Sequence, residues 1–514
     1  MLNNVKINAS VIKKGEGFVE KFQSALKELA AGNQPKNTQE LTVYEKSFEQ
    51  KNNTSLVMVK SGTEKYLLAA GDGEIFQALH GETVGNGKVC ELSHDNAQVI
   101  QQYFGYTRPQ AFGTEIATMG LGDRLGVASP GHIETTRERK VKPILAQQSI
   151  RELTLLNRTM TDILDAAAFA VFQEGYKDGY GADADHIKLE EDIVHAINLG
   201  FSFITLDCSE QIRNDIEGMS SEEILQEFNK LSSDEKDYYH DQYLNQSFDA
   251  AGVAISFDEE KLAKNALVYG EAINFMEHVY TQYIIKSDHP IDFEISIDET
   301  ETVTAPESHF FVGKELERRG VKVESMAPRF CGEFQKGIDY IGDLQQFEKE
   351  LSEHAAIARH FGYKLSIHSG SDKFSVFPII GKYTEGVLHI KTAGTNWLEA
   401  IRVIAKENPD LYRRMHVYAE DHFEETLQYY HVTPDLDSIA PLHDTADADL
   451  PKYMDHDAAR QLFHVTYGIL LTAKDDSGKD LFHTEFFETL LNNEDTYRDG
   501  LVSHIGRHLD LLGL

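Results

Sequence analysis

The sequence has few cysteines, few prolines and a shortage of basic residues. The three cysteines, Cys90, Cys208 and Cys331, show no CxxC spacing, which argues against a disulfide framework or a zinc ribbon and favours a reducing compartment. Lysine and arginine number 49 against 84 acidic residues, a net charge of −35, and this excludes a protein that binds nucleic acid through a basic surface. With 12 prolines in 514 residues and 41% hydrophobic residues, the chain has the composition of an ordered globular protein.

Long apolar runs are also missing. The first 17 residues lack the apolar stretch of a signal peptide, and the most apolar helical segment, 163–172, is too short to span a bilayer. We therefore expect a cytoplasmic protein with no membrane partner. Composition does not indicate the oligomeric state.

The chain has three parts. Residues 1–108 have the alternation and turns of a separate α/β domain, and residues 433–514 are predicted to form a helical C-terminal extension. Between them, residues 109–432 alternate short apolar runs with amphipathic helices, as in a (β/α)8 TIM-type barrel, with a mostly helical insertion at about 209–290 after the fourth strand. The eight predicted strands are 115–121, 143–148, 180–185, 201–207, 292–298, 321–327, 364–368 and 387–391.

The strands end in charged residues. In the fifth strand, apolar residues alternate with Glu294, Ser296 and Asp298, which we expect to point into the barrel, with Glu299 following at the rim. The same parity turns His368 inward in the seventh strand, and His389 and Lys391 inward in the eighth. The third strand ends in Asp185 and His186. Active sites of such barrels lie at the strand C-terminal ends, so these side chains are candidate functional residues.

Buried charges must pair or bind a cation. The three histidines His186, His368 and His389, with the carboxylates Asp298 and Glu299, offer the nitrogen and oxygen ligands of an open Zn²⁺, Mn²⁺, Co²⁺ or Ni²⁺ site. The alternative is that they form salt bridges and hydrogen bonds that only stabilise the barrel.

Other polar residues are candidates for substrate binding. Asp123 and Arg124 follow the first strand and either contact a substrate or form a buried ion pair. They lie in GLGDRLG, which departs from a dinucleotide-binding fingerprint in its spacing. Hydroxyl recognition is a possible role for Gln147 and Gln148. Anion binding is a possible role for two cations, Arg329 and Lys373.

Several long motifs resemble the tagaturonate epimerase family. In chain order they are GTEIATMGLGDRLGVASPGHI, ILAQQSIRE, FQEGYKDGYGADADHIK, ISIDETETVT, RFCGEFQKGIDYIGDL, IHSGSDKFSV, HIKTAGTNWLEA and FHVTYG. They extend from about residue 111 to beyond residue 460. The resemblance implies a metal-dependent epimerase that interconverts tagaturonate and fructuronate by inverting C4 of a ketohexuronate, counted from the hydroxymethyl end.

This chemistry suggests roles for the candidates. The inverted carbon is not adjacent to the ketone, so simple deprotonation cannot invert it. Two routes remain: transient oxidation, which needs a nicotinamide site that the sequence does not show, and retro-aldol cleavage of the C3–C4 bond with re-addition, which we favour. We hypothesise that His186, His368 and His389 bind the metal, with Asp298 as a possible fourth ligand. Glu299 and Asp185 are the candidate acid/base pair, and Asp298 and Glu299 are interchangeable in these roles. Lys391 is a candidate for stabilising the enediolate, and Arg124, Arg329 or Lys373 for holding the carboxylate; the insertion is a candidate lid.

Three alternatives stay open at this point. A metal-dependent hydrolase on the same barrel needs similar ligands but activates a water. An aldose-ketose isomerase acts at C1 and C2 of a sugar acid. A uronate-binding protein binds without turnover. Barrel architecture alone does not distinguish these.

Overall fold

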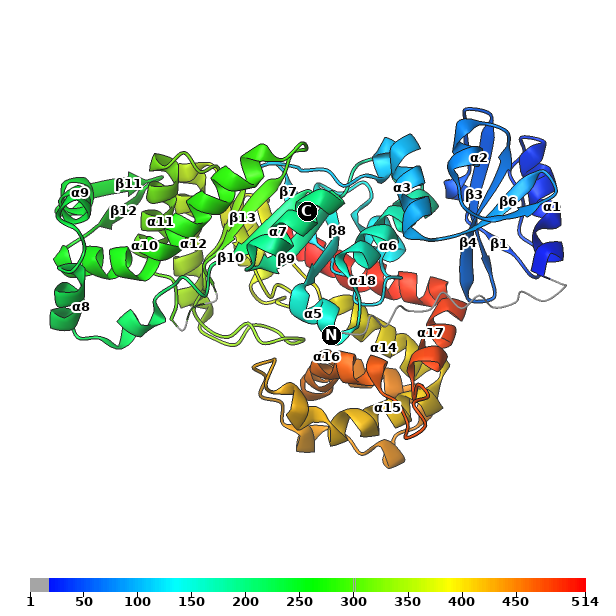
Figure 1. Cartoon of the computed structure of the whole chain (residues 1–514). Helices are drawn as coiled ribbons and strands as arrows, with labels where there is room; N and C mark the ends of the chain where they lie inside the picture. Colours follow the sequence, from blue (N-terminus) through cyan, green and yellow to red (C-terminus); the bar gives the residue numbers. More distant parts are fainter. Residues whose placement is uncertain (1–17, 299, 301) are drawn as a thin grey trace. The chain divides into compact units, whose positions relative to one another are not determined.

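The chain folds into two compact units (Figure 1). The computed structural model describes residues 18–298, 300 and 302–514. The first unit comprises the chain up to Thr107 together with Ala168–Lys177, and the second comprises Arg108–Ala167 and Asp178–Leu514.

The first unit is an antiparallel sheet with helices on both faces. Its strand order is β1-β3-β4-β6-β5, and β2 pairs with β3. Along β3, Val57 packs towards one face with α1, while Leu56 packs towards the other with α2, α3 and the end of α6 (Met160–Gln173), as alternation requires. The elements are α1 (Phe18–Ala30), β1 (Thr42–Val43), β2 (Glu49–Lys51), β3 (Thr54–Ser61), β4 (Glu64–Gly71), α2 (Glu74–Ala78), β5 (Glu82–Val84), β6 (Gly87–Glu91) and α3 (His94–Tyr103).

The second unit contains a closed barrel of eight parallel strands, which confirms the predicted (β/α)8 fold. Each of the eight predicted segments contributes one strand, and β16 pairs with β7 to close the barrel. In chain order the strands are β7 (Ala117–Gly120), β8 (Val141–Ser149), β9 (Gly181–Ile187), β10 (Phe203–Asp207), β13 (Asp292–Ser296), β14 (Ser325–Ala327), β15 (Lys364–Ile367) and β16 (Leu388–Lys391).

Helices connect the strands and cover the barrel. Two of them, α7 and α12, end at Gly200 and Gly362, whose φ angles of 92° and 79° are the left-handed conformation that stops a helix and favours glycine. The connecting helices are α4 (Ser129–Thr136), α5 (Ile150–Leu155), α6 (Met160–Gln173), α7 (Glu190–Leu199), α11 (Pro306–Arg318), α12 (Leu344–Phe361), α13 (Phe377–Thr384) and α14 (Thr395–Glu407).

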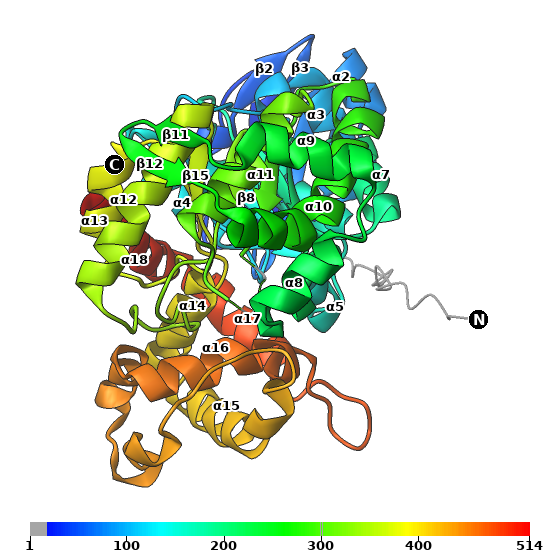
Figure 2. The same cartoon turned by 90° about the vertical axis from the view of Figure 1, so that its left-hand side faces the viewer.

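The insertion between β10 and β13 is mostly helical, as predicted, and also contains a short hairpin (Figure 2). A buried carboxylate fixes it to the barrel helices, because Glu315 of α11 accepts hydrogen bonds from Tyr238 at 2.6 Å and Tyr243 at 2.7 Å. Its elements are α8 (Ser221–Phe228), α9 (Ser233–Tyr243), β11 (Ser247–Ala250), β12 (Val253–Ser256) and α10 (Glu259–Gln282).

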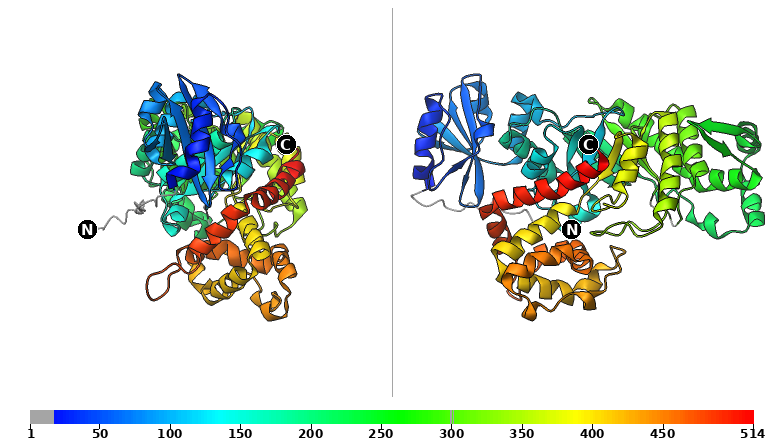
Figure 3. Two further views of the ribbon diagram at one scale, coloured as in Figure 1. Left: turned by 90° about the vertical axis from the view of Figure 1, so that its right-hand side faces the viewer. Right: turned by 180° about the vertical axis from the view of Figure 1, so that it is seen from behind.

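The C-terminal extension is helical and packs on α14 (Figure 3). Trp397 of α14 is fully buried there, and its indole Nε1 donates to the carbonyl of Phe463 at 2.7 Å. The helices of the extension are α16 (Asp457–Thr472), α17 (His483–Asn492) and α18 (Glu494–Leu512), and α15 (Pro409–Asp421), which precedes the extension, also packs on α14. In the described part of the chain, no helix combines the length and the apolar character needed to cross a membrane.

Candidate active site

A cavity of about 460 Å³ opens at the C-terminal ends of the barrel strands. This is the end of a (β/α)8 barrel at which active sites form. Its wall includes residues that end or follow all eight strands, namely Arg124, Ser149, Asp185, His186, Asp207, Asp298, Lys336, His368, Ser369 and Lys391.

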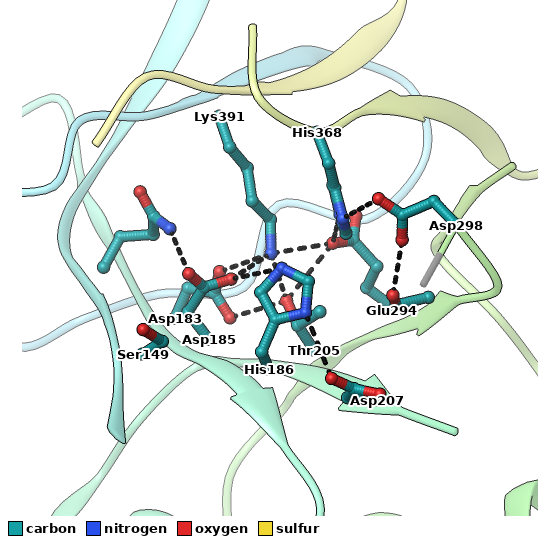
Figure 4. A network of polar contacts seen from close by, with 12 residues as sticks. Ser149, Asp183, Asp185, His186, Thr205, Asp207, Glu294, Asp298, His368 and Lys391 are labelled. Carbon is teal, nitrogen blue, oxygen red and sulfur yellow. Dashed lines mark hydrogen bonds and ion pairs between the residues drawn. The ribbon is translucent and has the colours of Figure 1, made fainter. Parts of the chain in front are cut away.

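Lys391, the last residue of β16, is the centre of a buried polar network in this cavity (Figure 4). Its Nζ lies 2.6 Å from Asp185 Oδ1, 3.0 Å from Asp183 Oδ2 and 2.9 Å from Glu294 Oε1, and it also donates to Thr205 Oγ1. An ammonium group has three hydrogens. Two of them are donated in hydrogen bonds, to Asp185 and Thr205, and the contacts with Asp183 and Glu294 are ion pairs.

The ammonium group separates the protonation behaviour of two neighbouring aspartates. Burial raises the pKa of Asp185, but Lys391 and His186 outweigh burial and bring this pKa below the ordinary value. For Asp183, burial raises the pKa to about 7 despite the attraction of Lys391, because other carboxylates lie nearby. Asp185 is therefore ionised at neutral pH, whereas Asp183 is protonated part of the time.

Two histidines face carboxylates in the same cavity. His368 lies between Glu294 Oε1, 2.8 Å from its Nε2, and Asp298 Oδ2, 3.1 Å from its Nδ1. The Nδ1 of His186 lies 3.5 Å from Asp207 Oδ2, and the two imidazoles meet edge to face with centroids 4.9 Å apart. Burial lowers the pKa of His368, but Asp298 and Glu294 outweigh it and raise this pKa to about 10.

A local irregularity in β9 brings Asp185 and His186 to the cavity together. Ala184 pairs with Ile204 of β10 and Ile187 pairs with Leu206, so two residues of β9 oppose one residue of β10. His186 also has a φ of 52°, a left-handed conformation that is strained for a residue with a Cβ. In a regular strand, consecutive side chains point to opposite faces, and the bulge removes that restriction.

The network contains more negative than positive charge. Five carboxylates face two ammonium groups, Lys391 and Lys188, and two imidazoles, so one negative charge is uncompensated when every carboxylate is ionised and both imidazoles are protonated. The carboxylates are Asp183, Asp185, Asp207, Glu294 and Asp298. Buried charge of this kind calls for protons or a cation, and imidazoles with carboxylates are suitable ligands for a divalent metal ion. The residues present therefore fit such an ion chemically, although His368 must release one carboxylate to bind it.

A second histidine group lies between the loop after β15 and α18. Ligand atoms of Asp372, His504 and His508 lie within 4.8 Å of one another, and the group could hold a metal ion. However, Arg460 Nη2 lies 2.7 Å from Asp372 Oδ2, and His508 Nε2 accepts the backbone N–H of Asp372 at 3.0 Å. A guanidinium group thus already compensates the carboxylate, and the lone pair of one imidazole is occupied. We interpret this group as an anchor of the loop on α18.

Several predicted site residues line the cavity. Besides the other strand-end residues, these are Arg124 and Gln147. The Arg124 guanidinium pairs with buried Glu152 and stacks on Tyr467, 3.9 Å from the ring centroid, so its buried ion pair is with Glu152 and not with Asp123, the partner considered from the sequence. Gln147 Nε2 donates to Asp185 Oδ2 at 2.7 Å and so helps to position that carboxylate. Glu299 lies outside the described residues.

Other predicted residues lie outside the cavity wall. Asp123 accepts backbone N–H groups of the loop after β7, including that of Ala128 at 2.7 Å. Gln148 accepts from Arg158 at 3.2 Å, and Arg329 donates to the carbonyl of Thr300.

His389 and Lys373 are the two larger departures from expectation. His389 points into the barrel but lies below the cavity, where its Nδ1 is 2.8 Å from Thr118 Oγ1 and its ring packs on Phe203. The alternation of side chains along a strand correctly predicts that His389 points into the barrel, but it does not predict how far below the cavity the side chain lies. Lys373 is fully buried and donates to three backbone carbonyls, those of Gln335, Ile338 and Ser371, at 2.6 to 2.9 Å. It holds loops together and does not reach the cavity.

The structure adds cavity residues that the sequence analysis missed. Asp207 is the last residue of β10 and also the last residue of the fourth predicted strand. The rule that functional residues lie at strand ends could therefore have identified it as a candidate. Lys336 follows β14, and His464 lies on α16, far along the chain from the barrel strands. No strand-end signal marks these last two. Only Glu210 of the insertion lines the cavity, so the described residues give little support to the predicted lid.

Comparisons with known proteins identify the family. A family model described as tagaturonate epimerase matches residues 44–512. A tagaturonate/fructuronate epimerase of Thermotoga maritima is 43% identical over 477 residues, covering 91% of this chain and 96% of that protein. A glycerol-complexed crystal structure of the fructuronate-tagaturonate epimerase UxaE from Cohnella laeviribosi shares 55% identity at a TM-score of 0.92, covering 96% of this chain and 99% of that chain. The native crystal structure gives the same TM-score at 54% identity. The chain therefore belongs to the tagaturonate epimerase family and is a carbohydrate epimerase, an isomerase.

Proposed function

We propose that this protein interconverts tagaturonate and fructuronate by a retro-aldol and aldol sequence in the cavity of the barrel. The observation that carries the proposal is the pairing of an ionised carboxylate, Asp185, with an ammonium group, Lys391, beside two imidazoles at the strand ends. The named relatives support the substrate pair.

The position of the inverted carbon determines the chemistry. C3 is the carbon next to the C2 ketone, and C4 is the carbon after it. The ketone therefore does not acidify the C–H bond of C4. Removal of the C4 hydroxyl proton instead allows the C3–C4 bond to break, with its electron pair passing to C3 and the ketone as an enediolate. The aldehyde fragment then rotates so that the C4 carbonyl presents its opposite face to C3. C3 adds to that face, and a proton returns to the C4 oxygen.

Asp185 is the proposed base for the C4 hydroxyl. It lines the cavity, and Lys391 and Gln147 hold its two carboxylate oxygens in place. A positioned carboxylate of this kind contributes roughly 10²- to 10⁴-fold to the rate. Since three carboxylates and the Thr205 hydroxyl of the protein surround Lys391, we assign it the positioning of Asp185 instead of direct contact with the enediolate. Glu299 is retained as the proposed acid/base partner on the sequence argument.

His186, His368 and Asp298 are the proposed holders of a divalent cation. A bound cation supplies Lewis-acid polarisation of the ketone oxygen. The surplus of buried carboxylates supports this assignment. His389 is left out of the ligand set because it lies below the cavity.

Nuclear magnetic resonance tests the proposal. Fructuronate labelled with ¹³C is incubated with chelator-treated protein, and Mn²⁺, Zn²⁺, Co²⁺ or Ni²⁺ is then added singly. We expect tagaturonate signals only after a metal is restored. Absence of conversion with every metal would overturn the proposed reaction, and full conversion by metal-free protein would overturn the role of the cation.

A further inference from the structure

One corner of the cavity differs in charge from the carboxylate-rich network. It is formed by the loops after β15 and β16, the seventh and eighth strands of the barrel, through Ser369, Ser371 and Gly394. In many (β/α)8 enzymes these two loops, together with a helix N-terminus, bind an anion. Helix α14, of 13 residues, begins here with Gly394 as its N-cap, and this residue has no side chain to accept from the first turn.

His464 provides an independent sign of a ligand in this corner. The side chain lines the cavity, is 1% exposed, and has no hydrogen-bond partner at Nδ1 or Nε2 among the described residues. Two glycines make room for its ring: a Cβ on Gly394 would lie 2.0 Å from His464 Cε1, and one on Gly337 would lie 3.4 Å from Nδ1. A buried polar group without a partner is costly, so a donor or acceptor is expected from a bound molecule.

Lys336 brings positive charge to the same corner. Its Nζ donates to Ser369 Oγ at 2.8 Å, and its side chain lines the cavity. Arg124 also lines the cavity, but buried Glu152 compensates its charge. Among the cations that line the cavity, Lys336 is the one that donates to Ser369 of this corner, whereas Lys188 lies beside Asp207 and Arg151 donates to the carbonyl of Tyr429.

On these observations we infer that Lys336, His464 and the N-terminus of α14 form the subsite for the substrate carboxylate, an inference that rests on the proposed function. Buried carboxylates repel an anionic group from the network around Lys391, so the acid end of a sugar acid is directed to this corner and the ketone end towards His368. The carboxylate stays bound here while the C4 carbonyl turns over.

The environment of His464 suits this role. Burial, with Arg124 and Lys336 nearby, holds the pKa of His464 well below its usual value. The ring is therefore neutral and offers one N–H donor. A neutral donor beside a lysine binds a carboxylate without needing to be protonated itself.

Binding measurements on two six-carbon probes test the subsite without requiring turnover. Gluconate carries the carboxylate, and glucitol has a hydroxymethyl group in its place. By calorimetry we expect Lys336→Met to weaken gluconate binding by about 10- to 100-fold, the range for a hydrogen bond to a charged group, and to leave glucitol binding within about twofold. Lys336→Arg should retain most of the gluconate affinity. Equal effects on both probes, or no effect on either, would overturn the inference.

Control experiments separate the other outcomes. Lys382→Met removes a surface lysine that pairs with Glu348, and it should leave both affinities unchanged. His464→Gln, a second variant at the subsite, should also weaken gluconate selectively. If inorganic phosphate bound at least tenfold more tightly than gluconate, the subsite would belong to a phosphate ester and not to a carboxylate. If wild-type protein bound gluconate as expected but failed to convert fructuronate, the proposed reaction would fail while the subsite stood.

Discussion

Replacing Asp185 with asparagine tests the proposed base with little disturbance of the fold. The substitution keeps the shape of the side chain and removes one negative charge from a network that has a surplus of them. One oxygen still accepts from Lys391. The other position faces Gln147 Nε2, which now donates to Asp185 Oδ2. Gln147 Oε1 has no hydrogen-bond partner among the described residues, so the amide can turn over and accept from the new NH₂ group.

The expected result is a large kinetic effect with a small effect on stability. Lys391 keeps Asp183 and Glu294 as partners, so we expect the free energy of unfolding to change by no more than about 1 kcal/mol, the usual contribution of one hydrogen bond. Loss of a positioned base should lower kcat by about 10²- to 10⁴-fold, which is about 2.7 to 5.5 kcal/mol in activation free energy.

The assay follows the formation of tagaturonate from fructuronate by ¹³C nuclear magnetic resonance, with urea unfolding of the same sample. Asp192→Asn, in α7 at the wall of the same cavity, is the matched control, and it should stay within about threefold of wild type in kcat/KM. If Asp185→Asn retained kcat within tenfold of wild type, Asp185 would not be the base. Loss of folding would instead show that the carboxylate is needed for the network.

Three further predictions concern the ion pair, the metal and the insertion. Arg124→Met should lower the free energy of unfolding by about 3 to 5 kcal/mol, because Glu152 becomes a buried unpaired charge, and Arg124→Met with Glu152→Gln should recover much of the loss in urea unfolding. His368→Ala should lower bound metal, measured by elemental analysis, together with activity, whereas His504→Gln should retain the metal; the reverse pattern would assign the metal to the group near α18. Glu315→Ala removes the acceptor of two tyrosines of the insertion, so limited proteolysis should cut the insertion faster than in wild type, and unchanged cleavage would contradict the anchoring role.

The barrel was predictable from the sequence because its signals are local. Predicted strand segments of five to seven residues, separated by helices of which two end at a glycine, identified all eight strands. Parity then placed Glu294, His368 and Lys391 correctly inside the barrel, because side chains alternate strictly along a strand.

Depth and long-range packing were not predictable in this way. His389 has the same parity as Lys391 but lies two residues earlier in β16, which is enough to put it in the layer below the cavity. The charge of Lys373 suggested anion binding, yet it donates to three backbone carbonyls, two from the loop after β14 and one, that of Ser371, from its own loop. His464 reaches the cavity from a helix of the C-terminal extension, and only the tertiary fold brings it there.

The central claim is that C4 is inverted by breaking and remaking a carbon–carbon bond. Fructuronate with deuterium at C4 tests it most directly, because the retro-aldol route never breaks the C4–H bond. We predict that the tagaturonate formed retains all of its deuterium and that the labelled substrate reacts at nearly the rate of the unlabelled one. Loss of deuterium, or a severalfold slowing of the reaction, would show that the C4–H bond breaks and would contradict the account.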